Sequence, residues 1–364
     1  MNLSEIQVSA GALRHNVALL RRHTGDRKTF IAVVKGNAYG HGLESVVSAI
    51  ETEVDGFQVD DLDELRVLRP FTRKRILVLG YVPRDSIVEV AELGGELALY
   101  DTDRLAPLAA AGVPVHLKVD ALLGRQGVLP DDLDGFLTAL RAHPELRVLS
   151  AYGHFANIED TTDLVHAEEQ IATFEDAFEK IASQYPGIGR HLSATSGLLT
   201  VERSNDLVRI GIGTYGMYPS VSLDRRYAEM RLRPALRWVS HLAQVKTLRA
   251  RHPIGYGLTY VTSRETRIGI VPQGYSDGYD RGLSNVGEVL VQGRRCSVLG
   301  RVAMNMFAVD LSEVPSAKAE DEVVLLGEQA GERITAEEIA SRLGTINYEV
   351  TTRLSALLPR QLVP

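Results

Sequence analysis

The sequence contains a single cysteine, Cys296, among its 364 residues. One cysteine cannot form a disulfide within the chain, and it cannot supply a cysteine-based zinc site. The sequence also lacks any apolar run approaching the ~18 residues that a membrane-spanning helix requires. The N-terminal stretch "MNLSEIQVSAGALRHN" has no apolar segment of the kind found in signal peptides. These absences favour a cytoplasmic protein.

No block of like charge occurs along the chain, and the formal net charge is −7. A global positive field that would attract nucleic acid or anionic lipid is therefore excluded. The composition, with 45% hydrophobic and 24% charged residues, is that of an ordinary soluble protein. A chain of this length can form two domains with a sizeable core. An enzyme or a binding protein is the general expectation.

From Thr29 to about Met217, the sequence alternates between short apolar segments and amphipathic segments. The apolar segments are typical of buried strands: "FIAVV" at 30, "GFQV" at 56, "ILVLG" at 76, "LALY" at 97, "VHLKV" at 115, "VLSAYG" at 148, "HLSAT" at 191 and "LVRIG" at 207. Eight strand–helix units over ~200 residues predict an α/β fold, a (β/α)₈ barrel. A doubly wound open sheet fits the same alternation, because the pattern does not show closure.

The pattern changes after Leu223, where short strands are separated by glycine-containing turns. One strongly helical segment, "TAEEIASRLG", has Thr335 as its expected N-cap and Gly344 just past its end. We therefore predict a barrel domain over 11–223 and a smaller, mostly β domain over 224–364.

The stretch "FIAVVKGNAYGHG" places Lys35 at the end of the first predicted strand. The C-terminal strand ends of a (β/α)₈ barrel carry the active site, where a lysine amine can act as a nucleophile. A solvent-facing lysine before a flexible glycine-rich loop explains the same pattern. The spacing alone leaves both interpretations open.

An ordered series of motifs decides between them, because "VVKGNAYGHG" closely resembles the pyridoxal-phosphate (PLP) lysine motif of alanine racemases. Further matches follow in the family's order: "HLKVDALLGRQG", "GHFANIEDTTD", "SATSG", "VRIGIGTYGMYP", "GYGLTY", "GYSDGYDRGLSN", "LGRVAMNMFAVDL" and "TINYEV". The resemblance implies a PLP-binding barrel, a segment 1–10 that packs with the C-terminal domain, and a head-to-tail homodimer with shared active sites. It also implies the substrates L- and D-alanine and a role in supplying D-alanine for peptidoglycan.

The resemblance assigns two acid/base residues, Lys35, which also carries the PLP, and Tyr256 of the partner subunit. Two bases suit a racemisation, because a proton leaves one face of a planar intermediate and returns to the other. His154 corresponds to the histidine that hydrogen-bonds the tyrosine, and Arg209 to the arginine that faces the pyridine nitrogen. An arginine does not readily give up its proton, so it disfavours a protonated pyridine.

The remaining matched residues are implied to bind the cofactor phosphate or the substrate. The phosphate would be held by Tyr39, Ser196, Tyr348 and the backbone N–H groups of Gly211 and Ile212. The substrate carboxylate would be held by Arg125 and the backbone N–H of Met304. Lys118 corresponds to a lysine that is carbamylated in many members, and a carbamate would orient Arg125. The substrate entrance would be formed by Tyr275, Arg281 and Arg301.

The sequence departs from the usual family pattern near several of these residues. Gly36 replaces an alanine, Thr195 an asparagine and Asn305 an aspartate, and "DALLGRQG" replaces a more usual "DTGMGRLG". None of these departures removes a residue assigned to proton transfer. Asn305 removes a negative charge close to the expected carboxylate site, so it bears on substrate preference.

Four alternatives to a dedicated alanine racemase stay open at this point. A broad-specificity amino-acid racemase would use the same mechanism. A decarboxylase, aldolase or dehydratase of the PLP-barrel type would leave "GYGLTY" unexplained, and the sequence has no obvious metal-ligand cluster. A non-catalytic PLP carrier would not need the long region after Leu223. A sugar-binding or structural barrel would not explain the pair Lys35 and Tyr256.

Overall fold

The computed structural model describes residues 4–25, 28–159, 161, 163–201 and 205–364. The chain folds into two compact units. One unit, the barrel unit, comprises Leu13–Ala38 and Val47–Arg233. The other, the β unit, comprises Met1–Ala12, Tyr39–Val46 and Pro234–Pro364. Within the described ranges, no helix is both long enough and apolar enough to cross a bilayer.

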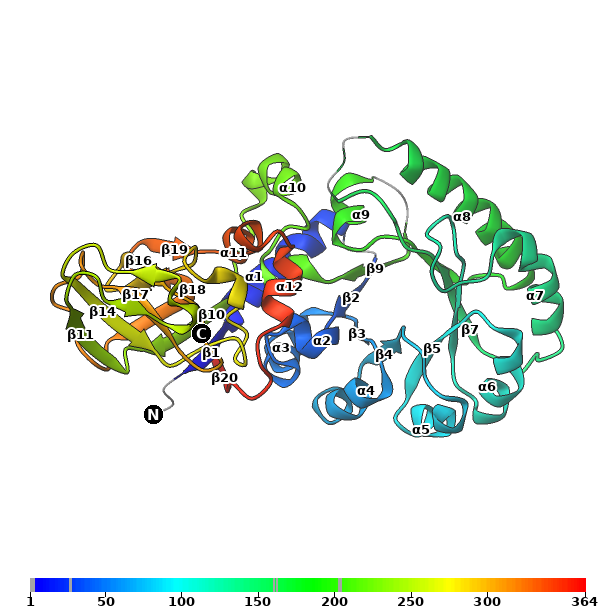
Figure 1. The fold of residues 1–364 in the computed structure, drawn as a ribbon. Helices are drawn as coiled ribbons and strands as arrows, with labels where there is room; N and C mark the ends of the chain where they lie inside the picture. The colour runs from blue at the N-terminus through cyan, green and yellow to red at the C-terminus, as the bar shows by residue number, and fades with distance from the viewer. Residues whose placement is uncertain (1–3, 26–27, 160, 162, 202–204) are drawn as a thin grey trace. The chain divides into compact units, whose positions relative to one another are not determined.

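Eight parallel strands form the sheet of the barrel unit (Figure 1). They are β2 (Thr29–Val33), β3 (Gly56–Val59), β4 (Arg75–Val78), β5 (Gly95–Leu99), β6 (Val115–Lys118), β7 (Val148–Tyr152), β8 (Gly189–His191) and β9 (Leu207–Ile210). Their order is β8-β7-β6-β5-β4-β3-β2-β9. The two outer strands meet through backbone bonds from Arg209 N–H to the Ser193 carbonyl (3.1 Å) and from Asp206 N–H to the Arg190 carbonyl (3.0 Å). The predicted (β/α)₈ barrel is confirmed, and the open sheet is excluded.

Helices alternate with these strands in sequence. They are α1 (Ala10–Thr24), α3 (Leu43–Ile50), α4 (Leu62–Leu68), α5 (Ile87–Glu92), α6 (Leu105–Ala111), α7 (Leu133–Leu140), α8 (Val165–Gln184), α9 (Thr195–Thr200) and α10 (Val221–Arg226). Helices α4 to α8 lie outside the strands (Figure 1). In α4, Leu62, Leu65 and Leu68 are buried, which is the three-residue spacing of one helix face. The Asp61 side chain caps α4 by accepting the N–H of Glu64 (2.9 Å).

The β unit contains a ten-stranded sheet. Its strands are β1 (Glu5–Ser9), β10 (Leu236–His241), β11 (Gln244–Leu248), β14 (Thr266–Val271), β15 (Glu288–Val291), β16 (Arg294–Leu299), β17 (Phe307–Asp310), β18 (Glu322–Gln329), β19 (Glu332–Ile334) and β20 (Arg360–Val363). Strand β1 pairs antiparallel with β10 and parallel with β20, so the N-terminal segment is part of this sheet.

The β unit also contains a small two-stranded sheet, formed by β12 (Pro253–Ile254) and β13 (Tyr260–Val261). Two helices follow later in the chain, α11 (Ala336–Leu343) and α12 (Asn347–Thr352). The Thr335 hydroxyl caps α11 by accepting the N–H of Glu338 at 3.1 Å. Gly344 follows α11 with a left-handed φ of 69°, a conformation that glycine adopts without a Cβ penalty. Both predicted ends of this helix are confirmed.

Candidate active site

Lys35 follows β2 at the C-terminal end of the barrel, and its loop has an unusual backbone. Residues Gly36, Asn37 and Ala38 of the segment α2 (Lys35–Tyr39) all have left-handed φ and ψ values. The Ala38 N–H still donates to the Val34 carbonyl (2.8 Å). Gly36 has φ 64°, a value at which glycine avoids the strain of other residues. The departure from alanine at this position is therefore compatible with the turn.

The Lys35 amine lies beside a carboxylate at the end of the next strand. Its Nζ is 3.2 Å from Oδ1 of Asp60, and the two side chains are 45% and 52% exposed. The loop backbone is held from α4, where the Glu64 carboxylate accepts the N–H groups of Asn37 (3.1 Å) and Asp60 (2.9 Å). The sequence motifs did not include Asp60 or Glu64. Their position directly after a barrel strand, in the segment "VDDLDE", is the signal that could have found them.

Arg209 is buried in β9 and is held by acceptors from two neighbouring strand ends. Its guanidinium donates to the carbonyls of Gly153 (2.9 Å) and His191 (3.0 Å), and to Nδ1 of His191. Burial, partly offset by Tyr152 and reinforced by Arg125, lowers the pKa of Arg209 to about 10. The side chain is therefore cationic at neutral pH, and it offers N–H donors and no acceptor.

Tyr152 connects this arginine to Lys118 within the barrel. Cζ of Arg209 lies 5.1 Å and Nζ of Lys118 lies 5.7 Å from the centroid of its ring. Its hydroxyl is buried and has no hydrogen-bond partner among the described residues. Burial raises the pKa of Tyr152, so the phenol is neutral. A neutral, unsatisfied hydroxyl here indicates a polar group that the protein alone does not provide.

His154 and Lys118 share an environment dominated by positive charge. Burial, followed by the charges of Arg209, Arg125, Lys118 and Lys35, lowers the pKa of His154 to about 3. Burial and then Arg125 and Arg209 lower the pKa of Lys118 to about 8. His154 is therefore neutral, and Nη2 of Arg209 lies 3.5 Å from its Nδ1. The structure brings these matched residues into electrostatic contact with Lys35.

The loop that carries Arg125 is organised by one carboxylate. Asp120 accepts the backbone N–H groups of Leu123 (3.0 Å), Gly124 (3.0 Å) and Arg125 (2.9 Å). Leu122 adopts a left-handed φ of 61° within this turn. The unusual "ALL" segment therefore still forms a tight turn, and the Arg125 side chain is exposed.

The matched phosphate-binding residues of the barrel unit lie after its last two strands. Ser196 lies in α9, and Gly211 immediately precedes a short 3₁₀ helix that begins at Ile212. The Thr195 hydroxyl accepts the N–H of Gly213 (3.3 Å), so this departure from asparagine joins the two segments. The Ser196 hydroxyl donates to Glu159 (3.2 Å), a contact that a phosphate at this hydroxyl would have to displace.

In the β unit, the remaining two matched phosphate ligands lie next to each other. The rings of Tyr39 and Tyr348 have centroids 5.9 Å apart. The turn after Tyr39 packs closely on α12, since a Cβ added to Gly40 would lie 1.9 Å from the Thr351 carbonyl oxygen. Only glycine fits at this position, which explains one of the glycines that follow Lys35.

Tyr256 is 73% exposed and lies in an open groove of about 580 Å³. Arg301 and Met304 line the same groove. The Arg301 guanidinium packs on Gly257, where an added Cβ would lie 3.1 Å from its Cζ. Asn305 donates to the Ser276 hydroxyl (2.7 Å), which donates to the Met304 carbonyl (2.9 Å). The structure therefore brings the matched tyrosine, arginine and methionine together on one surface.

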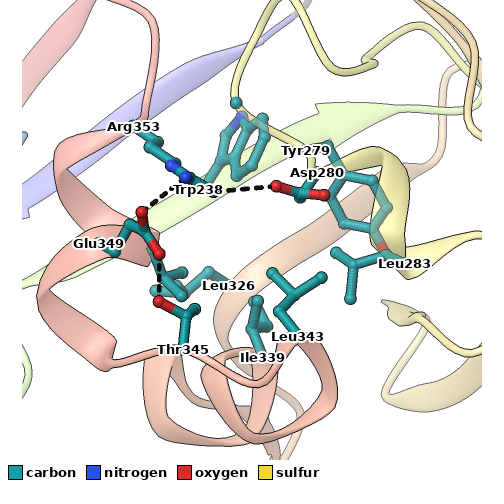
Figure 2. Close-up of a pocket in the computed structure, with 12 residues that line it drawn as sticks. Trp238, Tyr279, Asp280, Leu283, Leu326, Ile339, Leu343, Thr345, Glu349 and Arg353 are labelled. Carbon is teal, nitrogen blue, oxygen red and sulfur yellow. Dashed lines mark hydrogen bonds and ion pairs between the residues drawn. The ribbon is translucent and has the colours of Figure 1, made fainter.

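Tyr275 and Arg281 line a second hollow of about 480 Å³. Figure 2 shows the adjoining small cavity, of about 20 Å³, whose walls include Trp238, Leu326 and Ile339. Along one side of it, Arg353 pairs with Asp280 (3.1 Å) and with Glu349 (2.5 Å). Asp280 also accepts the Gly282 N–H (2.7 Å) at the start of the turn that carries Arg281. This ion-pair chain ties the Arg281 turn to α12, the helix of Tyr348.

Both parts of the chain match one protein family. Residues 8–219 match the alanine racemase N-terminal domain, and residues 235–362 match the alanine racemase C-terminal domain. The chain belongs to the alanine racemase family. An alanine racemase from Syntrophobacter fumaroxidans is 36% identical over 361 residues, which cover 95% of this chain and 94% of that protein. Alanine racemase 2 of Bacillus subtilis is 35% identical to this chain, and the match covers 98% of this chain and 93% of that protein.

Solved structures of alanine racemases share the fold over the whole chain. The crystal structure of the Bacillus anthracis enzyme with bound L-Ala-P has a TM-score of 0.92 at 32% identity, covering 100% of this chain and 96% of that one. The biosynthetic alanine racemase of Pseudomonas aeruginosa has a TM-score of 0.88 at 33% identity, with both chains covered completely. The resemblance inferred from the motifs is confirmed.

Proposed function

We propose that this protein interconverts L- and D-alanine with PLP as its cofactor. The observation that carries the proposal is Lys35, a lysine at the end of the first barrel strand in a chain that matches alanine racemases along its whole length. The proposed physiological role is the supply of D-alanine for peptidoglycan, which fits a cytoplasmic location.

The side chains of the barrel mouth fit PLP by their chemistry. When bound, PLP supplies an electron sink for the charge left when an amino acid loses its α-proton. Lys35 would hold the cofactor through its amine, and Arg209 would be the residue at its pyridine nitrogen. Its phosphate would be held by Tyr39, Ser196, Tyr348 and the N–H groups of Gly211 and Ile212. The unsatisfied Tyr152 hydroxyl, buried between Lys118 and Arg209, supports an additional polar occupant.

Proton transfer would use a base on each face of the substrate α-carbon. The Lys35 amine would take or return the proton on the face of the D-enantiomer. The phenol oxygen of Tyr256 of the partner subunit would do so on the face of the L-enantiomer. An ordinary tyrosine has a pKa of ~10 and needs stabilisation of its phenolate near neutral pH. His154 would provide this stabilisation.

His154 can provide that stabilisation because its tautomer is set by Arg209. The imidazole is neutral, and its Nδ1 faces the Arg209 donor Nη2 at 3.5 Å. The proton of a neutral imidazole then lies on Nε2, which can donate to a phenolate. A hydrogen bond to the charged form of a group favours that form. His154 would thus lower the pKa of Tyr256 of the partner subunit.

Substrate binding would rest on Arg125 and the backbone N–H of Met304, with Lys118 as a support. A guanidinium can hold a carboxylate through two parallel hydrogen bonds. Lys118 has a pKa of about 8, so roughly a quarter of its amines are neutral at about pH 7.5, against about one in a thousand for an ordinary lysine. Its neutral nitrogen could attack CO₂ and release one proton to water. The resulting carbamate would be an anion facing Arg125.

Shared active sites would require a homodimer, in which the exposed Tyr256 groove meets the barrel mouth of the other subunit. The 73% exposure of Tyr256 supports a partner surface over this groove. Tyr275, Arg281 and Arg301 would then border the substrate entrance.

The test is incubation of the purified protein and PLP with L-alanine, D-alanine and a panel of other L-amino acids, followed by chiral chromatography. We expect both alanine enantiomers to reach an equal mixture, and a Lys35→Ala variant to be inactive. No conversion of alanine by a PLP-loaded protein would refute the proposal. Equal rates on many amino acids would instead support a broad-specificity racemase.

A further inference from the structure

A continuous chain of hydrogen bonds crosses the barrel interior behind Arg209. Six neighbouring strands, β9 to β4 in their spatial order, contribute one polar side chain each: Arg209, His191, Ser150, His116, Glu96 and Arg75. His191 and His116 are fully buried, and Ser150 is 1% exposed. The chain therefore runs from the functional end of the barrel to the opposite end, where Glu96 and Arg75 lie near the strand starts.

The distances join every member of the chain to the next. Ser150 Oγ lies 2.7 Å from Nε2 of His191 and 2.5 Å from Nδ1 of His116. Nε2 of His116 lies 2.9 Å from Oε2 of Glu96. The same carboxylate oxygen accepts Nη2 (2.8 Å) and Nε (3.1 Å) of Arg75. At the other end, Arg209 contacts Nδ1 of His191.

Only one placement of the protons along the chain, here called the proton order, fits the groups at both of its ends. An ionised carboxylate can only accept, so His116 must carry its proton on Nε2 and present Nδ1 as an acceptor. The Ser150 hydroxyl then donates to His116 and accepts from Nε2 of His191. This leaves Nδ1 of His191 without a proton, which is what the Arg209 donor requires. In the reverse order, a proton on Nδ1 of His191 would face an N–H of Arg209.

We infer that Glu96 is a remote positioning residue that fixes this proton order and thereby holds Arg209 in its orientation. The inference rests on the proposed function in one respect, namely that the orientation of Arg209 matters to racemisation. Glu96 touches neither cofactor nor substrate, and it acts through three intervening side chains.

The charge states of the buried groups agree with this assignment. Burial lowers the pKa of His116 and, more strongly, that of His191, so both rings are neutral. Burial opposes ionisation of Glu96, but the hydrogen bonds from His116 and Arg75 and the positive charge of Arg75 outweigh it and lower the pKa of the carboxyl. A fully satisfied buried network has one well-defined geometry, whereas a partly satisfied one is destabilising.

Histidine tautomers in the wild-type protein provide the first test. Two-dimensional ¹⁵N NMR of the holoenzyme, with ¹⁵N-labelled histidine, distinguishes the two ring tautomers. Variants that lack each ring, His116→Gln and His191→Gln, assign the signals. We expect both rings to carry their proton on Nε2. A proton on Nδ1 of His191 would overturn the inference, and this result requires no substitution at Glu96.

A pair of substitutions at Glu96 provides the second test. All three hydrogen bonds to Glu96 end on one oxygen, which the amide oxygen of Glu96→Gln can replace. Glu96→Leu has no acceptor and frees His116 to change its tautomer. Loss of a group that fixes a histidine tautomer reduces activity roughly 10- to 100-fold at metal sites. We expect a decrease in kcat of about tenfold for the leucine variant, with little change in KM, and a shifted His191 signal.

The glutamine variant should keep the wild-type tautomers and most of kcat. Glu89→Leu is the matched control, because it breaks an exposed glutamate–arginine pair with Arg66 outside the barrel, and it should retain wild-type kcat and NMR signals. Equal effects of Glu96→Gln and Glu96→Leu would show that hydrogen-bond acceptance is not the cause. If the leucine variant does not fold, the inference is tested by the histidine tautomers of the wild-type protein and by the kcat and NMR signals of the glutamine variant. A wild-type protein that does not racemise alanine refutes the proposed function, while the tautomer result still tests the proton order.

Discussion

The backbone N–H of Asn37 donates to Oε1 of Glu64 (3.1 Å), while Oε2 of the same carboxylate accepts the N–H of Asp60 (2.9 Å). One side chain in the first turn of α4 thus ties together the loops that follow β2 and β3. The loop after β2 is the left-handed turn next to Lys35. Left-handed residues other than glycine are strained and persist only where the surroundings hold them.

Glu64→Ala is therefore expected to loosen the Lys35 loop. Hydrogen bonds to a charged group contribute ~1.5–3 kcal/mol, so we expect a decrease in unfolding free energy of about 2 kcal/mol and a lower kcat. Denaturant unfolding and alanine racemisation measure the two effects. Glu92→Ala, at an exposed position of α5, is the control and should change neither. Wild-type stability in the Glu64 variant would contradict a structural role for these bonds.

Lys35 is expected to carry the cofactor. Borohydride reduction of the PLP-loaded protein, followed by peptide mapping, should place the pyridoxyl group on Lys35. Lys35→Ala should abolish this labelling and lower kcat by about a thousandfold or more, the range for loss of a general base. Lys118→Ala should still be labelled at Lys35. A pyridoxyl group on Lys118 or Lys246 would refute the assignment of Lys35 as the residue that carries the cofactor.

Carbamylation of Lys118 should depend on pH, because only the neutral amine reacts with CO₂. With a pKa of about 8, the neutral fraction falls about tenfold for each pH unit below that value. We expect a ¹³C NMR carbamate signal in the presence of ¹³C-bicarbonate near pH 8 that disappears on acidification. Lys118→Ala is the control and should lack the signal. A signal that persists in this variant would assign the carbamate to another group.

Asn305 is expected to affect substrate preference through both hydrogen bonding and charge. Its amide donates to Ser276, whereas an aspartate could only accept. We expect Asn305→Asp to raise the ratio of kcat/KM for alanine over serine by up to about fivefold, equivalent to ~1 kcal/mol at an exposed site. Ser276→Ala removes the same hydrogen bonds without adding charge and separates the two causes. An unaltered ratio in Asn305→Asp would show that the departure is neutral.

A mixture of two inactive variants tests the shared active site. Lys35→Ala and Tyr256→Phe homodimers should each be severely impaired. After random exchange of equal amounts, roughly half of the dimers combine both chains, and each such dimer has one intact site. We expect a substantial fraction of activity to return. If mass spectrometry confirms subunit exchange and the mixture still shows no racemase activity, each site is built within one chain.

From the sequence alone we predicted the alternation of strands and helices in the barrel and the order of the site motifs. One strand is displaced, because "HLSAT" at 191 overlaps β8 (Gly189–His191) only at its first residue. Strand positions follow from local apolar runs, so "GFQV" and "LVRIG" were located as β3 and β9. The caps at Thr335 and Gly344 follow from the chemistry of single residues at helix ends. Lys35 was placed at a strand end for the same local reason. The motif series from Lys35 to Tyr348 identified the family, because these residues keep their order along the chain.

Only the tertiary structure decided what surrounds these residues. The hydrogen bond from Asn37 to Glu64 joins the loop after β2 to helix α4, and the chain from Arg209 to Glu96 forms only when the barrel closes. The lowered pKa of Lys118 depends on burial and on the charges of Arg125 and Arg209. Arg209 is distant in sequence, and the sequence does not give the orientation of the Arg125 side chain. Hydrogen-bond direction and desolvation depend on distances between strands, and a linear pattern of residues does not contain those distances.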